Sequence, residues 1–188
     1  MLIPLKKLLR TRLLGRLQGK RDYAKVCEEL AAVPTGEIVV LDFSGVSLLS
    51  GSWANTMLVP LYRRAIEDEV DFFPVLANIA PDCLDDLLLV AEWNHQCYLH
   101  AETGKGEPVK AVLLGSLDPG QASTLRAVLE YGEVTGAELE RRFPQESTKA
   151  TAWNNRLKDL YVKRLLRRRK QGREMFYSPV VKEIAFNG

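Results

Sequence analysis

Five side chains between residues 148 and 158 have the types and spacing of a surface that reads nucleic-acid bases. Ala150, Trp153, Leu157 and Leu160 recur at helical spacing and predict a helix with one apolar face. The opposite face then carries small residues and one lysine: Thr148, Thr151, Ala152, Asn155 and Lys158. Lys149, beside Thr148, is a further expected DNA contact. Asparagine can form two hydrogen bonds with adenine, threonine offers a hydroxyl and a methyl group, and lysine can bind guanine or phosphate. This face therefore predicts contact with the base edges of DNA.

A basic hairpin is expected directly after this helix. The segments LLRRRK and REMFYSP are predicted to be two strands that turn around Gln171 and Gly172. Five cations crowd the tip: Arg167, Arg168, Arg169, Lys170 and Arg173. We expect this cluster to bind phosphates, although a solvated basic hairpin or a segment that contacts the acidic middle of the chain would have the same composition.

Two shorter helices are predicted ahead of the base-reading one. Asp118, Pro119 and Gln121 supply an N-cap, a first-turn proline and a partial capping box for the first helix, which ends before Gly132. Thr135 and Glu138 form the capping box of a second helix that Pro144 stops. The third helix, the base-reading one, is expected to be capped by Ser147 or Thr148.

Three helices followed by a basic hairpin, over residues 117 to 178, resemble the winged helix-turn-helix of MarR-like and related bacterial regulators. The resemblance implies base reading by Thr148, Thr151 and Asn155 with Lys158 alongside, and backbone contacts by Arg167, Arg168, Arg169 and Arg173. Those families place a glycine between the recognition helix and the first wing strand. This chain has Val162-Lys163-Arg164 there, so the helix either ends differently or runs longer.

The first two thirds of the chain alternate strand and helix patterns. Strands are expected at IVVLDF (38–43), FFPVLAN (72–78), CYLHAE (97–102) and VKAVLLG (109–115). Helices are expected from Ala54 to Ala65, with Pro60 bending the helix or delaying its start, and from Pro81 onward. This alternation predicts an α/β layer with a mixed sheet, in a domain over residues 1–115 that precedes the winged helix-turn-helix of residues 116–188.

The segment VVLDFSGVSLLSGSWANTML (39–58) resembles the STAS-like domains of bacteria, which combine an LDFxGV strand, a polar turn and an aromatic residue that opens a helix. The resemblance covers about residues 10 to 115 and implies a small sheet with packed helices. It also implies regulation through partner binding, in some members switched by serine phosphorylation at the turn. The phosphorylated members carry an Asp-Ser pair, whereas this chain reads Ser50-Gly51-Ser52. A phosphate on Ser52 would be stabilised at the helix N-terminus, whereas Ser50 or Ser52 as a plain N-cap is the other interpretation.

Charge is strongly segregated along the 188 residues, although the net charge is only +2. Residues 1–25 carry eight cations and one acid, residues 26–110 four against fourteen, and residues 111–188 fourteen against nine. Leucines 2, 5, 9 and 13 with surrounding cations predict a basic amphipathic helix over residues 1–21. This helix would dock on the protein itself, contact DNA, or lie on anionic lipid.

Metal binding and catalysis have little support. Cys83, His95, Cys97 and His100 have spacings that fit no closed zinc site, and the chain has no phosphate loop or Ser-His-Asp order. Three cysteines at unrelated spacings favour a reducing, cytoplasmic setting, and no apolar run reaches the roughly 18 to 20 residues of a membrane span. No enzyme activity, cofactor or metal is therefore expected.

These patterns favour a bacterial transcription regulator in which a STAS-like domain senses or dimerises and the winged domain binds double-stranded DNA. A homodimer is expected because two recognition helices must meet half-sites about 34 Å apart, with the sheet or the N-terminal helix as the interface. The alternative is a non-catalytic adaptor of a partner-switching system. Its acidic helix, with Asp82, Asp85, Asp86 and Glu92, would engage a kinase-like ATPase or a sigma-factor regulator.

Overall fold

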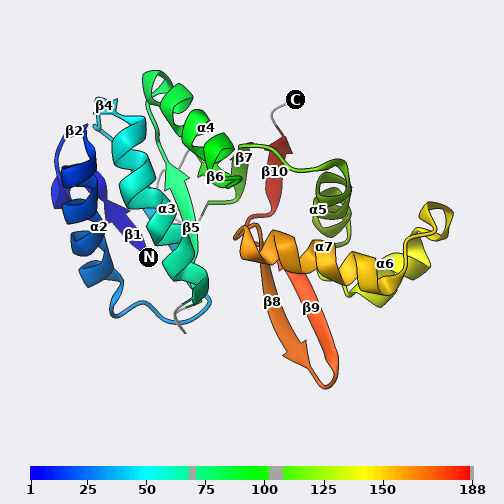
Figure 1. Cartoon of the computed structure of the whole chain (residues 1–188). Helices are drawn as coiled ribbons and strands as arrows, with labels where there is room; N and C mark the ends of the chain where they lie inside the picture. The colour runs from blue at the N-terminus through cyan, green and yellow to red at the C-terminus, as the bar shows by residue number, and fades with distance from the viewer. Residues whose placement is uncertain (68–70, 102–107, 187–188) are drawn as a thin grey trace. The chain divides into compact units, whose positions relative to one another are not determined.

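A computed structural model of the chain describes residues 1–67, 71–101 and 108–186. The chain divides into two compact units (Figure 1). The first consists of Met1–Ser116 together with the C-terminal residues from Ala185 onward, and the second consists of Leu117–Ile184. The first unit is built on a mixed sheet with packed helices, which confirms the α/β expectation at that level.

The six-stranded sheet has four parallel strands, then an antiparallel fifth strand, and a sixth strand at its edge. Its order is β1 (Leu2–Pro4), β3 (Ile38–Asp42), β5 (Phe73–Ala77), β6 (Tyr98–Ala101), β7 (Lys110–Leu114) and β10 (Glu183–Phe186). Pairing is parallel from β1 to β6 and antiparallel between β6 and β7. All of β5 and nearly all of β3 are buried, which explains their continuous apolar sequences.

Three helices pack on one face of this sheet: α2 (Arg16–Leu30), α3 (Gly51–Glu67) and α4 (Leu84–Trp93), the last preceded by a 3-10 turn at Pro81–Cys83. Val26, Trp53 and Leu87 come from the three helices and join Val39 and Leu41 of β3 in one core. The helices therefore lie side by side with their outer faces turned away from the sheet (Figure 1).

The expectation of one basic helix over residues 1–21 is wrong. The segment forms β1, a single turn α1 (Leu5–Leu8) and β2 (Arg12–Leu13), and α2 begins only at Arg16. Pro4 lacks a backbone donor and Gly15 has φ +79°, so both interrupt a helix. The leucine stripe is used differently: Leu5 and Leu13 are fully buried, while β1 pairs with β3 and β2 pairs with β4 (Leu48–Leu49).

A buried carboxylate fixes this N-terminal segment to the helices. Asp22 of α2 is fully buried and accepts hydrogen bonds from Arg10, from Gln18 Nε2 at 3.0 Å and from Trp53 Nε1 at 2.8 Å. Because a buried charge needs such partners, Asp22 holds the segment just before β2 together with α2 and α3.

The second unit contains three helices and a hairpin: α5 (Pro119–Tyr131), α6 (Gly136–Arg142), α7 (Ala150–Val162), β8 (Leu166–Gln171) and β9 (Glu174–Pro179). The two predicted caps are confirmed. Asp118 accepts from the Gln121 amide at 2.8 Å, and Thr135 and Glu138 form a reciprocal capping box. Val134, between α5 and α6, forms an isolated antiparallel bridge with Tyr177 and so pairs with the free side of β9.

Two local expectations are corrected. Neither Ser147 nor Thr148 caps α7: Ser147 has φ +52°, Lys149 takes the N-cap position, and the Ala150 amide donates to Glu140 Oε2 of α6 at 3.1 Å. In the hairpin, Gln171 pairs with Glu174, so the turn consists of Gly172 and Arg173 rather than Gln171 and Gly172.

The end of α7 resolves the question left by the missing glycine. The helix ends at Val162, and Arg164 adopts the left-handed conformation with φ +61°. That conformation usually goes to glycine because it is strained for other residues. The Arg164 side chain is buried, and its guanidinium lies 4.6 Å from the centre of the ring of Tyr161, in the last turn of α7.

Candidate nucleic-acid interface

Helix α7 exposes the face that its sequence pattern predicts. Trp153, Leu157 and Leu160 are buried, whereas Thr151, Asn155 and Lys158 are exposed. The last three positions are separated by four and three residues, so they form one stripe along the helix. The stripe ends in the exposed Val162.

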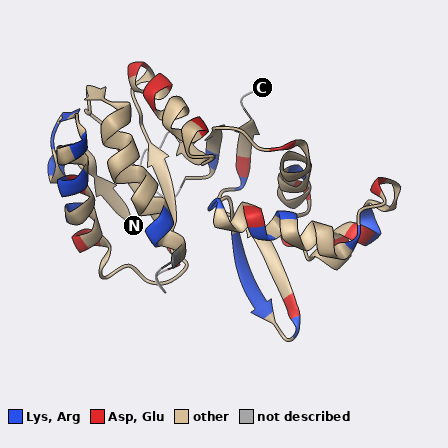
Figure 2. Cartoon of the chain, viewed as in Figure 1, with Lys and Arg blue, Asp and Glu red and all other residues tan. Residues whose placement is uncertain are grey.

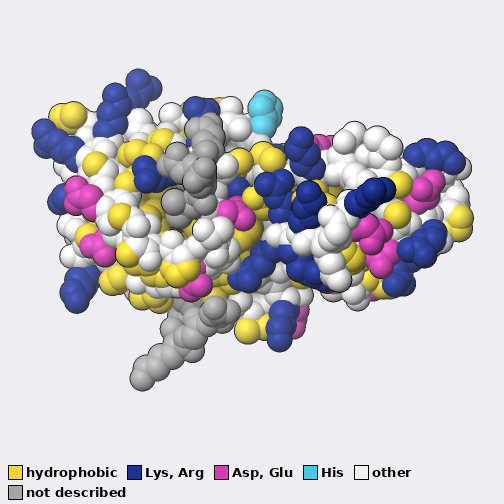
Figure 3. All heavy atoms as spheres, turned by 90° about the horizontal axis from the view of Figure 1, so that it is seen from below, with side chains coloured by type: hydrophobic (Ala, Val, Ile, Leu, Met, Phe, Trp, Pro, Cys, Tyr) yellow, Lys and Arg dark blue, Asp and Glu magenta, His cyan; other side chains and the backbone are white. Residues whose placement is uncertain are grey.

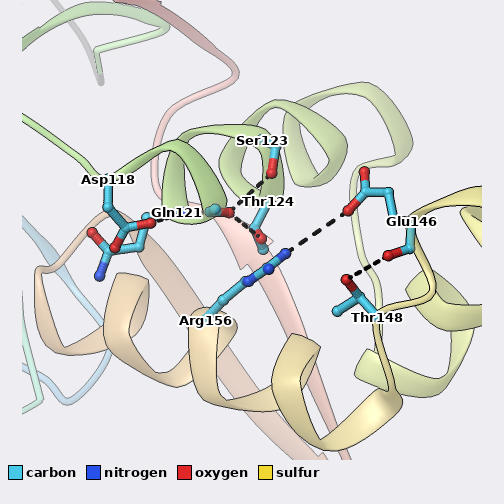
Figure 4. A network of polar contacts seen from close by, with 8 residues as sticks. Asp118, Gln121, Ser123, Thr124, Glu146, Thr148 and Arg156 are labelled. Atoms are coloured by element: carbon cyan, nitrogen blue, oxygen red, sulfur yellow. Dashed lines mark hydrogen bonds and ion pairs between the residues drawn. The ribbon is translucent and has the colours of Figure 1, made fainter.

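The start of α7 is organised by an acid from α6. Glu140 accepts from the Ala150 amide, and its other oxygen lies 3.8 Å from Lys149 Nζ. Lys149 remains 84% exposed, so this ion pair leaves the lysine accessible to another anion. Thr148 lies before the helix, is half-buried and donates to the Glu146 carbonyl at 3.3 Å, as Figure 4 shows. Its hydroxyl is therefore tied to its own turn.

Arg156 braces α7 against the rest of the second unit. It extends toward the loop before α7, where its guanidinium lies 3.9 Å from Glu146 Oε2 (Figure 4). It also lies 5.0 Å from the centre of the Trp153 ring. A side chain on Gly120, at the start of α5, would come within 3.0 Å of Arg156 Nε. Arg156 is thus a packing residue between α5 and α7 rather than part of the exposed stripe.

The hairpin carries its cations on one strand, so β8 is blue along most of its length in Figure 2, whereas β9 is mainly uncharged. Strand alternation divides these cations between two faces. Arg168 and Lys170 share one face, on which the Arg168 guanidinium lies 4.0 Å from the centre of the Tyr161 ring of α7. Arg167 and Arg169 point to the other face.

Arg169 makes three hydrogen bonds within the protein, although its side chain is 51% exposed. Its Nε donates to Glu133 Oε1 at 2.7 Å, its Nη2 donates to Glu133 Oε2, and its Nη1 donates to Gln171 Oε1 at 2.6 Å. The guanidinium also lies 4.6 Å from the centre of the Phe176 ring. The hydrogen bonds from Arg169 lower the pKa of the Glu133 carboxyl and raise that of the guanidinium. The expected phosphate contact by Arg169 would have to displace this bidentate pair.

The remaining cations of the hairpin differ in their exposure to solvent. Lys170 and Arg173 are exposed, and no acidic side chain in the described ranges pairs with either of them. Arg168 is exposed and Arg167 is half-buried. Figure 3, seen from below, shows Lys and Arg side chains gathered where the hairpin points toward the viewer. This basic surface lies next to the C-terminal end of α7 through the Arg168–Tyr161 contact.

Sequence reasoning missed the acids that shape this surface. Glu133 and Glu140 lie outside the helix and the hairpin that they organise, at separations of 36 and 10 residues from their partners. Their only sequence signal is the presence of acids in a basic segment. Asp159 is exposed next to Lys158 on α7 and reduces the positive charge of that turn.

The two serines of the first unit have different environments. Ser50 Oγ accepts from the Trp53 amide at 3.3 Å and from the Gly15 amide at 3.1 Å, so Ser50 caps α3 and ties it to the start of α2. Ser52 is exposed, and its hydroxyl lies 3.2 Å from that of Ser50.

Cysteine and histidine positions form no cluster. Cys97 donates to the Ser116 carbonyl at 3.4 Å, and His100 Nε2 accepts from the Ile79 amide at 3.3 Å. Within the described residues, no three Cys, His, Asp or Glu side chains are grouped so that they could hold a metal ion. In the same ranges, no helix has both the length and the apolar character to cross a membrane.

Comparisons with known proteins return no family model, no curated protein and no solved structure that matches this chain.

Proposed function

We propose that the second unit binds double-stranded DNA and that the chain is a dimeric transcription regulator. The observation that carries the proposal is the juxtaposition of two surfaces: the exposed stripe of α7, and the basic strand β8 that Arg168 joins to α7 through Tyr161. The order of three helices followed by a hairpin supports a winged helix-turn-helix, in which the last helix is the recognition helix.

Helix α7 would enter the major groove, which is about 12 Å wide and accommodates an α-helix with its side chains. Asn155 is the best-suited residue for base reading because its amide can both accept from and donate to adenine. Thr151 lies one turn earlier, and Lys149 and Lys158 flank the pair. In recognition helices, residues of the N-terminal part contact the bases.

The hairpin would bind the phosphates beside that groove. Lys170 and Arg173 at the tip, together with Arg168 and Arg167, are the proposed backbone contacts. Arg169 has a different role in this proposal, because Glu133 and Gln171 already accept from three of its five N–H groups. Such phosphate contacts would supply affinity and register, while α7 would supply sequence preference.

The proposal is tested by separating these roles. Selection from random duplexes identifies a preferred sequence, and anisotropy compares Asn155→Ala with the double variant Lys170→Gln/Arg173→Gln. We expect Asn155→Ala to lose roughly 10-fold in affinity or more for the selected duplex, with little change for generic DNA. The hairpin variant should weaken both duplexes by the same factor. Equal losses from both variants on both duplexes would contradict the assignment.

A further inference from the structure

A groove runs along the outer face of α3 in the first unit. It consists of two adjoining cavities of about 330 and 410 Å³ that share Asn55 as a lining residue. One stripe of α3 forms its floor, from Ser52 through Asn55 and Thr56 to Arg63. Because a helix rises about 1.5 Å per residue, this floor is about 16 Å long, which is the length of three helical turns.

The groove is basic. Arg16 and Lys20 of α2, four residues apart on one face, line one side, and Arg63 lines the floor. Among the described residues, none of these three cations forms an ion pair, and Asp86 is the single acid in the lining. The groove therefore carries an excess of positive charge that favours an acidic occupant.

The wall of the groove, α4, has the opposite charge on its exposed face. Asp82, Asp85, Leu89 and Glu92 follow one another at spacings of three and four residues, so they share one side of the helix and its preceding turn. Leu89 is 45% exposed and Trp93, which also lines the groove, is 73% exposed. An exposed tryptophan beside an exposed leucine is typical of a protein–protein contact, where tryptophan is often the dominant residue.

We infer that this face is a two-fold interface between copies of the chain, in which α4 of each copy lies in the α3 groove of the other. The acidic, Trp-bearing face of α4 matches the basic groove in charge, and the groove has the length of a short helix. Because α4 borders the groove, one two-fold axis makes both contacts at once, as an isologous interface requires. The inference rests on the proposed function in one respect: it supplies the dimer that a regulator needs in order to bind two half-sites on DNA.

The test is sedimentation equilibrium of the full chain without DNA, across a range of salt concentrations. We expect a monomer–dimer equilibrium that weakens as salt rises, because the contacts are between exposed charges. Trp93→Ala should raise the dimer dissociation constant by about 30-fold, the range of a dominant interface residue. Its far-UV circular dichroism should be unchanged, since the side chain is exposed.

Charge reversal makes the test specific. Variant one, Lys20→Glu/Arg63→Glu, has an acidic groove, and variant two, Asp85→Lys/Glu92→Lys, has a basic α4. In each variant alone, the groove and α4 carry charges of the same sign, so each variant should be monomeric. In an equimolar mixture, the acidic α4 of variant one faces the basic groove of variant two, and the basic α4 of variant two faces the acidic groove of variant one. The mixture should therefore dimerise. The matched controls, Arg21→Glu/Lys25→Glu and Glu28→Lys/Glu29→Lys, change exposed charges of α2 outside the groove lining and should dimerise like the wild type.

A wild type that stays monomeric, or a mixture that stays monomeric although the wild type dimerises, overturns the inference. If the wild type is monomeric, the α4 face is not an interface between copies of the chain. If only the mixture is monomeric, another surface forms the dimer. Neither outcome tests DNA binding itself, which is proposed for the second unit and is measured separately on a single duplex. A monomeric wild type contradicts only the dimeric part of the proposed function.

Discussion

At the scale of single residues, the hairpin cations differ in ways that their sequence does not show. Arg167, Arg168, Arg169 and Lys170 are consecutive, but strand alternation puts them on two faces and Glu133 occupies Arg169. A guanidinium that already makes three hydrogen bonds keeps only two N–H groups for a phosphate. Arg169 is therefore better understood as a clamp between the hairpin and the loop that precedes α6.

This clamp predicts an unusual response to charge removal. Glu133→Gln deletes a negative charge near the proposed DNA surface, yet we expect no gain in duplex affinity and faster amide hydrogen exchange in β8 and β9. Because Arg169 lowers the pKa of Glu133, the clamp is fully present above the usual carboxyl pKa and is lost as pH falls through the lowered value. The loosening should therefore also appear in the wild type at acid pH.

Glu174→Gln is the control for that variant, because it removes an acid of the hairpin that makes no hydrogen bond to Arg169, although Glu174 pairs across the turn with Gln171. It should leave hydrogen exchange unchanged and strengthen duplex binding slightly. Glu133→Gln could instead bind DNA more tightly, with a slope of log affinity against log salt that is steeper by about one, the value of one phosphate contact. Arg169 would then be a phosphate contact, and the prediction of the clamp would be contradicted.

At the scale of elements, the sequence predicts what depends on neighbouring residues. The Asp118 and Thr135 caps and the buried strand at Ile38–Asp42 were all readable, since each signal lies within a few positions. The start of α7 was not, because its cap comes from Glu140 on another helix. The N-terminal leucines fitted a single helix, and only the strand partners of Leu2 and Leu13 place these two residues in β1 and β2.

The position of α7 depends on a close approach to α6. A methyl group on Gly136 would lie 2.3 Å from Asn154 Oδ1 and 2.9 Å from the Ala150 carbonyl oxygen. Gly136→Ala should therefore destabilise the second unit by about 1–3 kcal/mol, the usual cost of overpacking, as measured by urea unfolding. Adding Asn154→Ala should restore part of the loss, because the side-chain clash disappears and the backbone clash stays. Unchanged stability of Gly136→Ala would mean that the two helices are not tightly packed there.

At the scale of the whole molecule, charge segregation is the property that the sequence conveyed best. The basic N-terminal stretch, however, does not form a separate helix: its Arg16 and Lys20 line the groove of α3. Two basic surfaces result, one in each unit, and the acidic middle of the chain supplies the α4 face. The groove could not be predicted, because its lining comes from three helices that only the packed sheet brings together.

The measurement that tests the central claim most directly is anisotropy of a generic labelled duplex against the full chain at several salt concentrations. Three exposed cations of the hairpin lie outside the Arg169 clamp, namely Arg168, Lys170 and Arg173. The logarithm of affinity should therefore fall with the logarithm of salt at a slope of at least about −3 per subunit. Absence of binding at low salt would contradict the claim. The basic hairpin would then be a protein-facing surface, and the chain would be better described as a signalling adaptor.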